Sequence, residues 1–165
     1  MISQSPESDE TSTWTVLDYE VQMYLGTSHV RKNLSCGNSP KTQIIKNALV
    51  ESSLIHMRIL TDIFLSRGNR PDDVQLKNFG FEDIVQHAGL AEMIDSFKNV
   101  YGKSSDEDSN CWIINKKFAH PTTQRSDRYD YSAVFNALDP LLKSIIYYVY
   151  NSKGRQLPYP LQSES

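Results

Sequence analysis

The chain has 165 residues, with 17 Lys and Arg against 20 Asp and Glu, and a formal net charge of −3. This length suits one domain, and a hydrophobic share of 39% argues against global disorder. The mild negative charge excludes a strongly basic nucleic-acid binder, though not a local basic patch. The two cysteines, Cys36 and Cys111, form no CxxC pair, which argues against a disulfide scaffold or a zinc ribbon.

The ends of the chain differ in composition from its middle. Residues 1–12 and 152–165 are polar or contain proline without periodicity, which predicts mobile tails around a helical domain at 13–151. The first ten residues, MISQSPESDE, have no basic segment and no apolar core of a secretory signal. No apolar run approaches the roughly 18 residues of a membrane span. We therefore expect a cytoplasmic protein without membrane contact.

Helical periodicity extends through this domain. The expected helices span about 14–34, 40–66, 81–101, 109–119 and 132–150. Ser39 and Ser109 can cap the second and fourth of them. Asp139 and Pro140 either kink the last helix or begin a new one. Gly89 is a candidate break in the third helix. Since strand-type alternation is absent from the sequence, the predicted fold is an all-α, antiparallel bundle of four to five helices.

The second helix has the clearest apolar side. On a helical wheel its apolar residues fill one arc, which we expect to face the core. The arc contains Ile44, Ile45, Ala48, Leu49, Ser52, Ile55, Ile59, Leu60 and Ile63.

Four polar residues of this helix form a first candidate site: Glu51, His56, Arg58 and Asp62. Three of them flank the apolar arc, and His56 lies within it. Arg58 and Asp62 are four residues apart and can pair directly. One interpretation is a surface salt bridge worth less than about 1 kcal/mol beside a core histidine. The other is a half-buried polar patch that serves a site or an interface, because buried charge is costly unless it is paired.

A basic segment, INKKFAHPTTQR at 114–125, forms a second candidate site. Between 111 and 128, four Lys and Arg accompany one Asp, a local charge of +3. A histidine as general acid or base, with cationic or amide donors for phosphate oxygens, is what attack by an RNA 2′-hydroxyl requires. The alternative is a helix end whose histidine and lysine bond to free carbonyls. The candidates are His120 and Arg125 for catalysis, and Asn115, Lys116, Lys117, Thr122, Thr123 and Arg128 for binding.

No metal or cofactor site is predicted. The four histidines are far apart in the sequence, without an HxxxH or Cys/His pairing. The seven glycines form no phosphate-binding loop, and no Gly-x-Ser-x-Gly motif is present for a nucleophilic serine.

Together the segments ESSLIHMRILTDIF (51–64) and INKKFAHPTTQR resemble the HEPN superfamily of small helical bundles, over roughly residues 41–149. The resemblance implies an all-α domain, often dimeric. It also implies either a metal-independent RNase of the toxin or defence type, or a non-catalytic module that binds RNA, a nucleotide or a protein. A homodimer, RNA or a nucleotide, and an antitoxin-like protein are the partners that it suggests.

The catalytic signature of that superfamily, an arginine shortly before a histidine, is incomplete in this chain. His120 matches the histidine, but the arginine would fall at Ile113, Ile114 or Asn115. Isoleucine cannot hold a phosphate with two hydrogen bonds as arginine does. The sequence therefore favours a degenerate binding module. The alternatives are an RNase, with His120 as general acid or base and Arg125 as phosphate clamp, and a helical adapter with no ligand.

Overall fold

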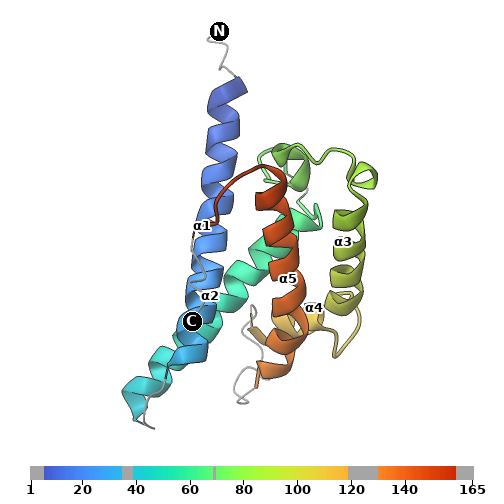
Figure 1. Ribbon diagram of the computed structural model, residues 1–165. Helices are drawn as coiled ribbons and strands as arrows, with labels where there is room; N and C mark the ends of the chain where they lie inside the picture. The colour runs from blue at the N-terminus through green and yellow to red at the C-terminus, as the bar shows by residue number, and fades with distance from the viewer. Residues whose placement is uncertain (1–5, 35–38, 69, 119–129, 159–165) are drawn as a thin grey trace.

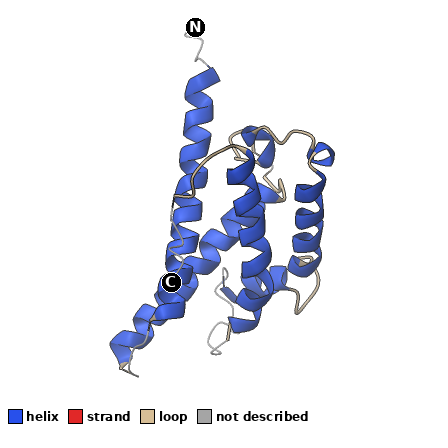
Figure 2. Cartoon of the chain, viewed as in Figure 1, coloured by secondary structure: helices blue, strands red, loops and turns tan. Residues whose placement is uncertain are grey.

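The structure, a computed structural model, describes residues 6–34, 39–68, 70–118 and 130–158 (Figures 1 and 2). No strand occurs within these ranges, and the predicted all-α bundle is confirmed. No helix in them is long and apolar enough to cross a membrane. The bundle contains the helices α1 (Pro6–Asn33), α2 (Pro40–Phe64), α3 (Ala88–Tyr101), α4 (Asn110–Trp112) and α5 (Ser132–Ser152). Two 3-10 turns, η1 (Leu76–Phe79) and η2 (Ile84–Gln86), precede α3, and a π-helical turn, η3 (Ile113–Phe118), continues α4.

Helices α1 and α2 form an antiparallel hairpin, and the end where they are connected projects from the bundle (Figure 1). α1 begins at Pro6, inside the segment predicted as a tail. Proline suits the first helical position. The predicted start of α2 is confirmed, since the Ser39 hydroxyl accepts a hydrogen bond from the Thr42 amide at 3.2 Å.

The predicted core side of α2 is right only at its C-terminal end, where Leu60 and Ile63 of the arc are buried, and is wrong elsewhere. Its buried residues are Ser53, Leu54, His56, Met57, Leu60, Thr61, Ile63 and Phe64. Ile44, Ile45 and Ile55 from the predicted arc are 68%, 50% and 44% exposed. At 3.6 residues per turn, the buried side is rotated by about 100° from that arc. The reason is that the first half of α2 packs beside α1 alone, and only the second half reaches α5 and η3.

Helix α5 packs against α3 on one side and α1 on the other (Figure 1). It continues through Pro140, so a new helix does not begin there and Asp139 is not a cap. Pro140 is exposed, and its carbonyl accepts a hydrogen bond from the Ser144 hydroxyl at 2.9 Å. α3 begins at Ala88, later than predicted, because η2 takes the preceding residues; Gly89 lies inside the helix and does not interrupt it.

The chain after α5 packs onto α1, although 152–165 was predicted as a tail. The Arg155 guanidinium bonds to Asp18 at 3.0 Å and lies over the ring of Trp14 at 4.3 Å. The Lys153 ammonium donates to the carbonyl of Gly80 at 3.3 Å. Leu157 packs against the core. Residues 153–157 therefore connect α5 to α1 and η1.

Candidate functional site

His56 is buried in the seam between α1 and α2. Its Nδ1 lies 2.6 Å from Oε2 of Glu20, which is also buried, and the ring of Tyr19 meets the imidazole edge-on with centroids 5.9 Å apart. A buried polar group needs such a partner, because leaving it unpaired would lower the stability of the fold by roughly 1–3 kcal/mol. His56 is thus a buried histidine held by a partner, which agrees with its interpretation as a core histidine.

Arg58 and Asp62 lie on a different side of α2 and are half-buried. Burial raises the pKa of Asp62; Arg58 and Arg67 lower it, and Asp73 raises it further. Arg58 therefore influences Asp62 electrostatically, and the direct ion pair between them stays a prediction. The four polar residues of α2 do not meet at one point, since His56 faces α1 and Glu51 is exposed.

The end of α2 and the π-helical turn are joined through a buried thiol. The Cys111 sulfur accepts hydrogen bonds from Nη1 of Arg67 at 3.6 Å and from Nδ2 of Asn115 at 3.4 Å. The guanidinium of Arg67 also lies over the ring of Tyr101, 4.9 Å from its centroid. Burial and the neighbouring Cys111 raise the pKa of Tyr101. The contacts of Arg67, Tyr101, Cys111 and Asn115 therefore connect α2, α3 and η3. Since Cys111 is only 1% exposed, its thiol is closed to reagents.

The second candidate segment is only partly described. Asn115 uses its amide on Cys111, Lys116 is exposed, and Lys117 lies in η3. The remaining candidates lie outside the described residues: His120, Thr122, Thr123, Arg125 and Arg128. Within the described part of the chain, no group of three or more His, Cys, Asp or Glu could hold a metal ion.

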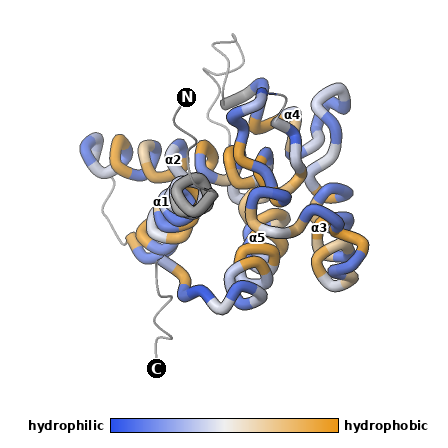
Figure 3. Tube along the Cα trace, turned by 90° about the horizontal axis from the view of Figure 1, so that it is seen from above, coloured by the Kyte–Doolittle hydropathy of each residue, from blue (hydrophilic) through white to orange (hydrophobic). Residues whose placement is uncertain are grey.

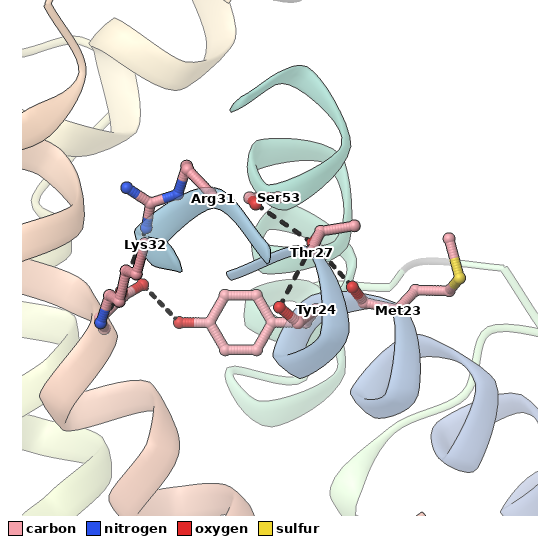
Figure 4. A network of polar contacts seen from close by, with 7 residues as sticks. Met23, Tyr24, Thr27, Arg31, Lys32 and Ser53 are labelled. Atoms are coloured by element: carbon pink, nitrogen blue, oxygen red, sulfur yellow. Dashed lines mark hydrogen bonds and ion pairs between the residues drawn. The ribbon is translucent and has the colours of Figure 1, made fainter. Parts of the chain in front are cut away.

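A polar cluster that the sequence did not reveal lies between α1 and α5 (Figure 4). The buried carboxylate of Asp139 accepts a hydrogen bond from the Tyr24 hydroxyl at 2.6 Å. Arg31 and Lys32, in the last turn of α1, reach the same carboxylate at 3.4 and 3.3 Å. One sequence feature could have indicated this cluster: Asp139 lies on an apolar face of the last helix, beside Leu138. A carboxylate buried on such a face requires a partner.

A second feature is the outer face of the α1–α2 hairpin, on the side away from α5. Two apolar stripes form it, one on each helix. They are Val16, Tyr19, Met23, Gly26 and Val30 on α1, and Ile45, Ala48, Ser52, Ile55 and Ile59 on α2. Tyr19 is 54% exposed and Val16 41%. Figure 3 shows apolar residues along the part of α2 that extends beyond the bundle. We call this surface the outer face.

The outer face has two properties that distinguish it from an ordinary surface. Both stripes advance by alternating steps of three and four residues, the spacing of a coiled-coil seam. Neither stripe contains a charged residue, although 22% of the chain is charged. At Gly26 an added Cβ would meet no described atom within 4 Å, so the surface there is open.

The positions of the catalytic resemblance can also be located in part. Ile113, where the superfamily signature would place its arginine, is buried in the core, and so is Ile114. Asn115 is the remaining position, and its amide bonds to the Cys111 thiol. Comparison with protein-family models, curated proteins and solved structures finds no match to this chain.

Proposed function

We propose that this chain is a non-catalytic helical binding module that associates with a second copy of itself through the outer face. The observation that carries the proposal is the pair of uncharged, heptad-spaced stripes on α1 and α2. Their exposed members are Val16, Tyr19, Val30, Ile45, Ala48 and Ile55, and the others are half-buried. Exposed apolar patches of several hundred Å² mark interaction sites on proteins that are otherwise well packed. A helix with a coiled-coil seam buries it against another helix.

The α2 stripe is complementary to itself. If two copies of α2 pair antiparallel about Ser52, Ile45 of one copy lies opposite Ile59 of the other, and the small Ala48 lies opposite Ile55. An interface with twofold symmetry requires this kind of match between a surface and its own rotated copy. The arrangement favours a second copy over an unrelated apolar partner.

The charges at the ends of the stripe match in the same register. Lys41 stands four residues before Ile45, and Asp62 stands three residues after Ile59. In the antiparallel pair, Lys41 of each copy therefore comes opposite Asp62 of the other. Charges at the rim of an interface fix its register more than they strengthen it.

The size of the outer face indicates a weak dimer. Each stripe covers 14 residue steps, about 21 Å along the helix axis, and two helices are together about 20 Å wide. Two copies would then bury roughly 800–1,000 Å², close to the lower bound of about 1,000 Å² for a specific interface. We expect association at micromolar concentrations.

One observation favours a binding role over RNA cleavage: Ile113, the residue at the arginine position, is a core residue. Membership of the HEPN superfamily remains part of the proposal and rests on the resemblance of the two motifs.

The experiment is a disulfide cross-link at the expected twofold axis. In a Cys36→Ser background, Ser52→Cys places a new thiol where the two copies of α2 would cross, and the remaining Cys111 is buried at 1% exposure. We expect mild oxidation to give a covalent dimer, since the Cα atoms of paired cysteines lie within about 7 Å. Ser96→Cys, an exposed residue of α3, is the matched control and should remain mostly monomeric.

Sedimentation of the chain without these substitutions tests the same surface independently. The average mass should rise with concentration between about 1 μM and 1 mM, the range of a weak interface. Ile55→Glu should abolish the rise, and Val100→Glu on α3, a residue exposed to a similar extent, should retain it. A monomer throughout that range, or equal cross-linking at Ser52 and Ser96, would contradict the proposal.

RNA cleavage is tested separately. Purified protein and its His120→Ala variant are incubated with structured and single-stranded RNA in the presence of a chelator. The proposal predicts no difference between the two proteins. Cleavage that disappears in His120→Ala would replace the binding module by the RNase.

A further inference from the structure

We propose that the cluster around Asp139, between the end of α1 and the middle of α5, binds a phosphate group. The cations of the cluster are Arg31, Lys32 and Lys143, and its one described carboxylate is Asp139. This site is independent of the outer face and of the basic segment at 114–125.

The geometry gathers more positive charge than the protein itself neutralises. Arg31 and Lys32 both approach Oδ2 of Asp139, at 3.4 and 3.3 Å. The other carboxylate oxygen, Oδ1, accepts the Tyr24 hydroxyl at 2.6 Å. Arg31 and Lys32 thus share one carboxylate, and Lys143, four residues after Asp139 on α5, interacts electrostatically with all three. The four groups sum to a net charge of +2, and the C-terminal end of α1 offsets only about half a charge of it.

The cations repel one another in this arrangement. Burial lowers the pKa of Lys143; Lys32 and Arg31 lower it further, and Asp139 opposes them. Burial also lowers the pKa of Arg31. Both directions mean that the folded protein holds these groups in the charged form at some cost. A bound anion would remove that cost, because it would add the missing negative charge.

Donors within the cluster also remain unused. The Arg31 guanidinium gives Asp139 a hydrogen bond at 3.4 Å, which is long, and its Nε is buried without a partner among the described residues. The Ser28 hydroxyl, three residues earlier on the same side of α1, is also buried without a partner among the described residues. Buried donors are nearly always satisfied, so these two indicate an absent acceptor or water.

The cluster is open to solvent mainly through Lys32, while the Nε of Arg31 is buried. The Lys32 side chain is 52% exposed and that of Arg31 17%. Figure 4 shows both side chains together with Tyr24 at the boundary of α1 and α5. The guanidinium carbon of Arg31 lies over the ring of Phe135, 3.6 Å from its centroid, and this contact restricts the side chain. A planar guanidinium flanked by two ammonium groups matches a tetrahedral oxyanion such as phosphate.

The simpler interpretation is that the cations only stabilise the end of α1 and neutralise Asp139. That interpretation needs one or two cations and gives Lys143 no task. It predicts that Lys143→Gln leaves stability unchanged or lowers it. The anion site predicts that Lys143→Gln raises the urea midpoint in chloride buffer, since a repelling charge is removed.

The binding experiment uses inorganic phosphate, titrated into the protein at constant ionic strength with chloride as the balancing ion. The readout is the proton and nitrogen chemical shift of the Arg31 Nε–H group and of nearby backbone amides. We expect a saturable change, with an affinity at least tenfold weaker in the Lys32→Gln, Lys143→Gln double variant. The control double variant, Lys98→Gln and Lys103→Gln at exposed positions, should stay within twofold of the parent protein.

A second titration with adenosine monophosphate separates the two sources of a phosphate group. Tighter binding than inorganic phosphate would identify a nucleotide, and equal binding would identify free phosphate. The proposal is overturned if the shifts do not saturate, if both double variants lose affinity equally, or if Lys143→Gln lowers the urea midpoint.

Discussion

Truncation of single side chains on α2 tests which side of this helix is in the core. Leu54 is fully buried, and Leu54→Ala removes three carbons, worth about 2.4 kcal/mol of transfer free energy. The cavity left behind adds to this, for a total of about 3–4 kcal/mol. Ile45 is 50% exposed, so Ile45→Ala loses about half the transfer term, leaves no closed cavity, and gains helix propensity. We expect it to cost about 0.5–1 kcal/mol.

The assay is urea unfolding followed by circular dichroism, at a protein concentration below about 1 μM so that association does not contribute. Ile59, which is half-buried against the core, should fall between Leu54 and Ile45. If Ile45→Ala costs as much as Leu54→Ala, the arc predicted from the sequence faces the core and the register described above is wrong. At high concentration the cost of Ile45→Ala should increase, because the outer face is then covered.

Three further predictions concern other parts of the molecule. Gly26→Ala should raise stability by about 0.5–1 kcal/mol in urea unfolding, because the added methyl group meets no described atom and alanine favours the helix. Glu20→Ala should cost more than about 1 kcal/mol in the same assay, because it leaves His56 buried without its partner. Stability should fall above pH 10, because burial raises the pKa of Tyr24 and of Tyr150 above the ordinary 10.0. The contribution of the two buried neutral hydroxyls to the free energy of unfolding is therefore complete below pH 10. It is lost at higher pH, where the unfolded chain releases these protons. Absorbance at alkaline pH should then show both hydroxyls ionising only as the protein unfolds, and a normal titration of both would contradict the burial.

Local signals in the sequence predicted the helices well where a cap or a proline marked the boundary. Ser39 and Ser109 both cap helices as predicted. The register of α2 was wrong because the longest apolar stripe on a helix need not face its own core. A wheel weights every residue equally, whereas only the second half of α2 contacts the rest of the bundle.

The candidate sites were harder to predict because their partners are distant in the sequence. His56 was singled out, yet its partner Glu20 lies 36 residues away. Asp139 was considered only as a helix cap, and Tyr24 is separated from it by 115 residues. Periodicity describes which side of a helix is apolar, but it does not tell which buried polar residues on two helices meet.

The strap at 153–157 and the Tyr24–Asp139 contact have a consequence for the order of folding. Helices α1 and α2 are neighbours in the chain and can pair early, because closing a short loop costs little entropy. The polar groups of α1 that face α5 must wait much longer, since their partners lie 115 to 137 residues further on. During synthesis Asp18 and Tyr24 therefore emerge long before the segment that satisfies them. The hairpin should form quickly, and docking of α5 with its strap should be the slow step that makes the fold cooperative.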